Sequence, residues 1–285
     1  MKFTLVVSDL HSGSMFGLIP PWARPNSGKI KKPKDMDVNL LQTHKEQLMQ
    51  LMQLQDSFYR AFMSVVRTLP LCDSVFILAD LLEGQQEKNG GAMLTSANTD
   101  DQSEIAVDIL DTILKQVGYP KVYGVRGTLY HVLQKGGRET EHSVYTRLHN
   151  VQAVEDVLFC HRTGLIWRLQ HFVGRSSVAH GKQTPLAKQQ IQNTLAAAMG
   201  KEHDADICLF GHVHYCVSAG FPSAGKTGFT CPCLKLRGEA YGRQYNDFYD
   251  VGFLLFGQEK NGAPLADYTK QVKIRTAYEK PALYA

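Results

Sequence analysis

Short apolar runs alternate along this chain with longer stretches in which apolar residues recur every three or four positions. The short runs are FTLVV at 3–7, SVFILA at 74–79, KVYGV at 121–125 and DICLF at 206–210. Runs of about four to eight apolar residues are typical of strands that are buried on both faces. We therefore predict buried strands at these positions.

The longer stretches have the periodicity of helices. Residues 39–69 place Leu41, Leu48, Leu51, Met52, Phe58, Phe62 and Val65 at helical spacing, and residues 101–117 do so with Ile105, Ile109, Ile113 and Val117. The second stretch begins at Asp101 and ends at Gly118, while a third, 185–199, begins with Thr-Pro and ends at Gly200. Such residues typically start and end helices. Strands that alternate with helices predict an α/β fold with helices packed on a sheet.

The remaining segments have other patterns. FTCPCLKL at 229–236 and YDVGFLLFGQ at 249–258 are typical of strands joined by a turn, and they predict a second, more antiparallel β layer. Residues 12–38 are basic and rich in Pro, Gly and Ser, and residues 84–100 are polar and rich in Gly. Loops of this length are usually functional or disordered. We expect a single domain spanning 1–285, with these two loops inserted.

Composition changes this picture little. The chain has 285 residues, of which 44% are hydrophobic and 20% charged, as in ordinary soluble globular proteins. Its net charge of +4 tolerates an anionic substrate without requiring one. The apolar run in MKFTLVVSDLH is too short for a signal peptide or a membrane span, so we expect a cytoplasmic protein without membrane contact. The six Cys residues show no disulfide framework and are expected to be free thiols.

Residues that bind metal ions follow several of the predicted strands. Asp9 and His11 follow the first strand, Asp80 the second, and His212 and His214 the fourth. Ligands bind at the carboxyl ends of strands in α/β sheets, and residues i and i+2 of an extended chain point to the same side. Each pair is therefore expected to present two ligands to one centre. Carboxylate and imidazole donors without thiolate suit Mn²⁺, Fe or a catalytic Zn²⁺, and such centres most often perform hydrolysis.

The motifs DLH, ADLLEG, RGT and GHVH, in this order, resemble those of the calcineurin-like metallophosphoesterase superfamily. That family has DxH, GDxxx, GNH, a His after a strand, and GHxH, and the resemblance covers nearly the whole chain. It implies a four-layer αββα sandwich, with two mixed β-sheets flanked by helices and two divalent metal ions. By this resemblance one ion is held by Asp9, His11 and His214, Asp80 bridges the two ions, and His212 holds the other. Mn²⁺ is the expected metal, with Fe, Zn²⁺ and Ni²⁺ as alternatives.

This sequence departs from the family pattern at three positions. Ala79 replaces the Gly of GDxxx, Thr128 stands where the family has its Asn ligand, and Leu129 stands where it has the His that protonates the leaving group. RGTLYH instead resembles a divergent branch, common among bacteriophage and prophage sequences, with GTxxH. Our hypothesis is that His131 contacts the phosphate or protonates the leaving oxygen, the alternative being a structural His that anchors the loop. Thr128 is predicted to supply a hydroxyl or a water molecule and to leave the second metal site weaker.

The remaining metal ligand is expected to be a His that follows another strand. His171, at the end of GLIWRLQHF, is favoured by its spacing over His180 in SSVAHGK, and both remain candidates. Glu83 either orients a ligand from behind or is a solvated carboxylate. Arg126 and Arg138 are candidate phosphate contacts, because a guanidinium matches phosphate with two hydrogen bonds, or else ion-pair partners within the fold.

These features predict a metal-dependent phosphoesterase that hydrolyses a phosphodiester of a nucleic acid or a nucleotide by means of metal-activated water. The basic, Trp-bearing segment 20–34 favours a nucleic-acid partner. A phosphomonoesterase and a cyclic-nucleotide phosphodiesterase fit the same ligands, and the missing Asn motivates a catalytically weak metal-binding scaffold. GFPSAGKT at 220–227 matches a nucleotide-binding P-loop in full, but no helix is predicted after it, so we interpret it as a hairpin turn. The sequence does not determine the oligomeric state.

Overall fold

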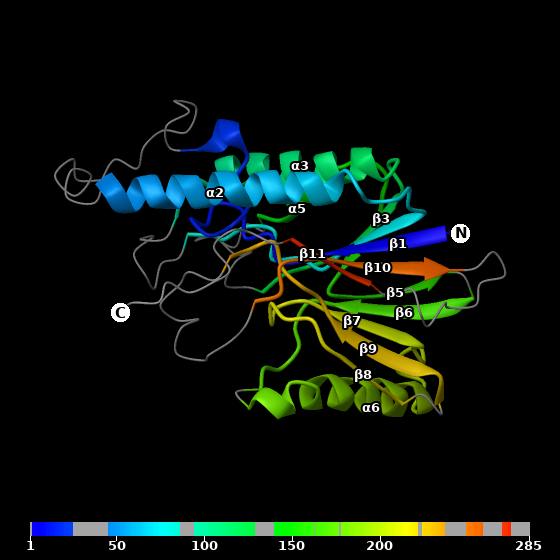
Figure 1. Cartoon of the computed structure of the whole chain (residues 1–285). Helices are drawn as coiled ribbons and strands as arrows, with labels where there is room; N and C mark the ends of the chain where they lie inside the picture. The colour runs from blue at the N-terminus through cyan, green and yellow to red at the C-terminus, as the bar shows by residue number, and fades with distance from the viewer. Residues whose placement is uncertain are drawn as a thin grey trace.

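The structure is a computed structural model, which describes residues 2–24, 45–85, 94–128, 140–162, 164–176, 178–221, 224–236, 249–258 and 270–274. These residues form two mixed β-sheets with helices on their outer faces (Figure 1). The six-stranded sheet has the order β11 (Lys270–Lys273), β10 (Gly252–Gln258), β1 (Lys2–Val7), β2 (Ser74–Ile77), β3 (Lys121–Val125) and β4 (Val151–Glu155). The five-stranded sheet has the order β5 (Val157–Arg162), β6 (Leu165–Gln170), β7 (Ile207–Phe210), β9 (Lys226–Thr230) and β8 (Ser218–Phe221).

The helices connect the parallel strands of each sheet. The six-stranded sheet is covered by α2 (Lys45–Val66), α3 (Thr99–Gln116) and α5 (His142–Tyr145), and the five-stranded sheet by α6 (Thr184–Ala198) (Figure 1). Two short 3-10 helices are η1 (Pro21–Ala23) and η3 (Ala179–Gly181). The start of α3 precedes its predicted position because the side chain of Asn98 accepts a hydrogen bond from the backbone N–H of Asp100.

Alternate residues of the central strands pack into different cores. Leu5 and Val7 of β1 contact the core beneath α2 and α3, whereas Val6 lies in a core between the two sheets. In β7, Leu209 faces the other sheet and Phe210 lies in a third core that contacts α6. Because successive side chains of a strand point to opposite faces, these cores separate four layers. The predicted αββα sandwich is confirmed.

The predicted arrangement of the C-terminal strands is wrong. β9 and β10 do not form one layer, since β10 pairs antiparallel with β1 in the six-stranded sheet and β9 pairs parallel with β7 in the other. The physical reason is that β10 is apolar on both faces: Phe253 packs beneath the helices and Leu254 packs between the sheets. Such a strand is most stable in the interior of a layered sheet.

The P-loop-like motif lies in a hairpin, as predicted. β8 and β9, which flank it, pair antiparallel, and its Lys226 forms an ion pair with Asp204. A strand therefore follows the motif, where a phosphate-binding loop requires the start of a helix.

The first half of the basic loop packs onto the helices. Trp22 Nε1 donates a hydrogen bond of 2.9 Å to Asp108 of α3, and Arg24 lies 2.7 Å from Asp56 of α2. Both side chains are thus engaged by carboxylates of the protein itself, and the nucleic-acid partner stays a prediction. The lysines of this loop lie outside the described residues. Within the described part of the chain, no helix is long and apolar enough to cross a membrane.

Candidate metal centre

The segments that follow β1, β2, β6 and β7 are joined by hydrogen bonds. Asp9 N donates to Ala79 O at 3.0 Å, and Gly211 N donates to His171 O at 3.0 Å. His212 N donates to the Asp9 carboxylate at 3.1 Å, which links the two sheets. These contacts bring the candidate ligands from both sheets to one place.

Six residues of these segments have a left-handed backbone conformation. The φ values are 52° at Asp9, 49° at His11, 62° at Ala79, 46° at Asp80, 71° at His212 and 59° at His214. Each such residue costs about 1–3 kcal/mol, so it persists only where the surrounding structure holds it. A concentration of strained residues at strand ends is typical of a functional site.

The first group of metal-ligating residues contains Asp9, His11 and His214, whose ligand atoms all lie within 4.8 Å of one another. His214 Nε2 lies 3.2 Å from Asp9 Oδ1 and 3.0 Å from His11 Nε2. All three side chains are buried or nearly so. Ligand atoms around one ion at about 2.0–2.2 Å have this kind of mutual spacing.

The second group contains Asp80, His171 and His212. His171 Nε2 lies 3.0 Å from Asp80 Oδ2, and both side chains are only 2% exposed. The other ring nitrogen of His171, Nδ1, contacts the carbonyl oxygen of Leu78. In the tautomer that carries its proton on Nδ1, the N–H group donates to that carbonyl. Nε2 then keeps its lone pair for an ion.

The residues present fit a divalent ion in each group. In the first group two ring nitrogens, His11 Nε2 and His214 Nε2, face each other at 3.0 Å beside a carboxylate. In the second, the buried Nε2 of His171 lies 3.0 Å from the Asp80 carboxylate. A cation would satisfy both arrangements. The nitrogen and oxygen donors suit Mn²⁺, Fe or a catalytic Zn²⁺.

Burial and neighbouring charges shift the pKa values of the ligand histidines in opposite directions. Burial would lower the pKa of His11, but nearby carboxylates, Glu83 first, raise it to about 9. Burial likewise opposes protonation of His171, yet Asp80 raises its pKa to about 10. Burial lowers the pKa of His214 to about 4. Because a metal ion binds neutral imidazole, its binding to either group competes with protonation of these histidines.

The two histidines of GHVH belong to different groups. Both histidines belong to the candidate metal centre, but the chain is not extended between them, since both residues have positive φ. His214 reaches Asp9, whereas His212 is grouped with Asp80. This division matches the one implied by the family resemblance. That Asp80 bridges two ions stays a prediction.

Both the backbone N–H and the hydroxyl of Thr128 form hydrogen bonds to Asp80. Its backbone N–H donates to Asp80 Oδ1 at 2.8 Å, and its hydroxyl donates to the same atom at 3.2 Å. Both donors stabilise the ionised carboxylate and fix its orientation.

Glu141 is a buried residue of the site that the sequence analysis missed. Its carboxylate accepts hydrogen bonds from Leu81 N at 2.5 Å and from Gly127 N at 3.0 Å, next to Asp80 and Thr128. Burial and the adjacent Asp80 raise the pKa of Glu141 to about 7. No spacing rule relates Glu141 to a motif, so only its place in the fold identifies it.

Other predicted site residues lie elsewhere or fall outside the described residues. His180 is exposed on η3 and belongs to neither group, so the geometry favours His171 as the ligand. Arg126 pairs with Asp156 at 3.2 Å, and its contact with phosphate stays a prediction. His131 and Arg138 lie outside the described residues. Glu83, by contrast, is buried against His11 and is not a solvated carboxylate.

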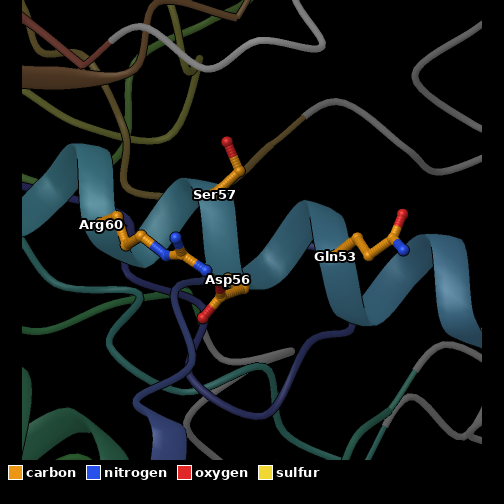
Figure 2. Close-up of a pocket in the computed structure, with 4 residues that line it drawn as sticks. All are labelled: Gln53, Asp56, Ser57 and Arg60. Carbon is orange, nitrogen blue, oxygen red and sulfur yellow. Dashed lines mark hydrogen bonds and ion pairs between the residues drawn. The ribbon is translucent and has the colours of Figure 1, made fainter.

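A hollow on α2 is lined by polar and charged side chains. Figure 2 shows its lining residues Gln53, Asp56, Ser57 and Arg60, with Arg60 reaching toward Asp56. Asp56 is paired with both Arg60 and Arg24. None of the lining residues belongs to either ligand group. We assign no function to this hollow.

Comparisons with known proteins show general similarity in structure only. No family model and no curated protein matches the chain. Vps29 from Chaetomium thermophilum aligns with a TM-score of 0.41 and 10% identity over 91% of this chain and 86% of its own. A single mutant of Vps29 from Entamoeba histolytica aligns with 0.40 and 15% over 90% and 85%, and an archaeal phosphodiesterase with 0.38 and 9% over 91% and 95%. These values are too low to transfer any role to this chain.

Proposed function

We propose that the chain is a metal-dependent phosphoesterase that hydrolyses a phosphodiester of a nucleotide or a nucleic acid. One observation carries this proposal: two groups, each with one carboxylate and two imidazoles, lie at adjoining strand ends. Two divalent ions, with Mn²⁺ expected, would be held by Asp9, His11 and His214 and by Asp80, His171 and His212. Such ions activate water and bind the oxygens of an in-line displacement at phosphorus.

The residues around the ligands keep them in fixed orientations. Thr128 donates two hydrogen bonds to Asp80, and His212 N donates to both oxygens of Asp9 at 3.1 Å. Nδ1 of His171 is engaged by the Leu78 carbonyl. Because the carboxylates and this imidazole are already oriented, binding of a metal requires little rearrangement, which is what a catalytic centre needs.

The surroundings of the second group favour a substrate with an aromatic substituent. Phe172 follows the ligand His171, is 54% exposed, and lies with its ring 4.9 Å from that of His212. An exposed aromatic ring offers a stacking surface for a base, a contact worth about 1–3 kcal/mol in nucleic-acid-binding proteins. This favours an ester of a nucleotide over a small monoester. We retain His131 as the proposed acid that protonates the leaving oxygen.

The first experiment is hydrolysis of bis-p-nitrophenyl phosphate and p-nitrophenyl phosphate by metal-stripped protein supplied with Mn²⁺. We expect turnover of the diester that requires Mn²⁺ and is lost in Asp80→Ala. If His131 is the general acid, His131→Ala should cut turnover by about two to four orders of magnitude and leave the metal content unchanged. Asp204→Ala, at an exposed carboxylate outside both groups, is the matched control and should retain activity.

The alternatives give different results in the same assay. A preference for the monoester would identify a phosphomonoesterase, and added cyclic nucleotides would reveal a cyclic-nucleotide phosphodiesterase. Bound Mn²⁺ without turnover of any of these esters would contradict the proposed enzyme and favour a metal-binding scaffold.

A further inference from the structure

A buried ion pair lies behind the first ligand group. Lys235, in the segment after β9, has its Nζ 2.9 Å from Glu83 Oε2 and 3.2 Å from Oε1. Both side chains are only 3% exposed. Removing two charges from water is costly, and apolar side chains of similar volume often stabilise a fold as well or better. The pair therefore calls for an explanation other than stability.

Glu83 also contacts a ligand of the first group. Its Oε2 lies 2.9 Å from Nδ1 of His11, while the opposite ring nitrogen, Nε2, lies 3.0 Å from His214 Nε2. A carboxylate beside Nδ1 keeps a proton on that nitrogen, so the lone pair of Nε2 points into the ligand group. Contacts thus run from Lys235 through Glu83 to His11.

The backbone around these residues is paired as well. Glu83 N donates to Ser12 O at 3.0 Å, and Lys235 forms an antiparallel β-bridge with Gly17. The three strand-end segments that carry His11, Glu83 and Lys235 are therefore fixed to one another. With the main chain held in this way, the direction of each side chain depends on the side chain it meets.

We propose that Lys235 is a positioning residue for the first metal group: it orients the Glu83 carboxylate, which in turn orients His11 with Nε2 toward the ion. Lys235 contacts both oxygens of the carboxylate, so it fixes the rotation of the group that Nδ1 meets. A charged ammonium has no lone pair to offer a metal, so Lys235 acts through its neighbours. This inference rests on the metal centre of the proposed function and not on its substrate.

The decisive variant is Glu83→Leu/Lys235→Met, which replaces the ion pair with apolar side chains of similar volume and is expected to fold. It lacks an acceptor for His11 Nδ1. In calorimetric titrations of metal-free protein with Mn²⁺, we expect the affinity of one site to fall by about 10- to 100-fold. Glu83→Gln/Lys235→Met keeps an amide oxygen that can accept from Nδ1 but lacks the ammonium that fixes its rotation, so it should recover only part of the lost affinity.

The matched control is Asp204→Leu/Lys226→Met, which removes an ion pair that contains no residue of either ligand group. It should bind Mn²⁺ as the unmodified protein does. A folded Glu83→Leu/Lys235→Met variant that binds Mn²⁺ with unchanged affinity would overturn the proposal and leave the ion pair with a purely structural role.

A second measurement does not depend on how well the variants fold. Nitrogen-15 NMR of the imidazoles in the unmodified protein, loaded with diamagnetic Zn²⁺, should show His11 protonated at Nδ1 and bound through Nε2. The opposite tautomer would overturn the proposal. Metal binding with the expected tautomer but no ester hydrolysis would support this inference while contradicting the proposed enzyme.

Discussion

At the scale of single residues, two glycines allow the ligand groups to approach the backbone. A Cβ atom at Gly127 would lie 2.4 Å from Asp80 Oδ1 and 2.9 Å from Asp80 N. One at Gly211 would lie 2.5 Å from Ser8 Oγ and 2.9 Å from His171 Nδ1. Both spaces are too small for any side chain, so each glycine is needed for packing against the site.

Gly127→Ala should therefore impair the metal centre. The added methyl group must displace the Asp80 carboxylate, and a displacement of about 1 Å at a catalytic group can cost about 100-fold in rate. Mn²⁺-dependent turnover of the diester measures this loss. Gly174→Ala is the control, because its Cβ would lie 3.7 Å from the nearest atom, Pro185 Cβ, an ordinary contact. Equal activity in the two variants would contradict this role for Gly127.

At the scale of elements, the short helix α5 supports the segments after β2 and β3. Glu141, which precedes α5, is fully buried and accepts from the N–H groups of Leu81 and Gly127. Those two segments carry Asp80 and Thr128. A single carboxylate thus fixes the backbone on both sides of the Asp80–Thr128 contact.

Glu141→Ala should destabilise the protein strongly. It leaves the buried N–H of Leu81 and the partly buried N–H of Gly127 without their acceptor, and a buried group left unpaired costs about 1–3 kcal/mol in the free energy of unfolding. Urea denaturation followed by circular dichroism measures the change. Glu104→Ala removes an exposed carboxylate that pairs with Arg147 at 2.8 Å, and it should cost no more than about 1 kcal/mol. A loss at Glu141 as small as that at Glu104 would contradict this account.

At the scale of the whole molecule, each ligand group joins the two sheets. Asp9 follows β1 and His214 follows β7, while Asp80 follows β2 and His171 follows β6. An ion in either group therefore links the six-stranded sheet to the five-stranded one. Because such a site exists only in the folded chain, metal binding should stabilise the fold.

Mn²⁺ should therefore raise the melting temperature of the metal-free protein. At 100 times its Kd, an ion that binds only the folded state stabilises it by about 2.7 kcal/mol. For a domain of about 150–250 residues, each kcal/mol raises Tm by about 2–4 °C. Differential scanning calorimetry should show this increase and its reversal by EDTA. The variant His171→Ala/His214→Ala, which lacks one ligand in each group, should show little of it, and an equal increase there would place the binding elsewhere.

Patterns within the chain were sufficient to predict its main elements. The run at 121–125 is β3 with the same bounds, and the periodic stretch at 101–117 is α3 within two residues at its start. The strand at 252–258 was assigned to the wrong layer, because an apolar run records burial and does not record which neighbour buries it. Glu141 and Lys235 were missed because a single charged residue outside a motif has no pattern of its own.

The sequence by itself determined the layered α/β fold and the kinds of donor at the strand ends, because periodicity is local and ligand types are chemical properties of residues. Only the tertiary structure decided the distances and orientations at which the donors meet. Left-handed residues occur at the strand ends that carry His212 and His214, and a local pattern of apolar residues does not encode them. The structure alone also placed Lys235 behind Glu83, far away in sequence. Such contacts depend on how the sheets pack, which no local pattern encodes.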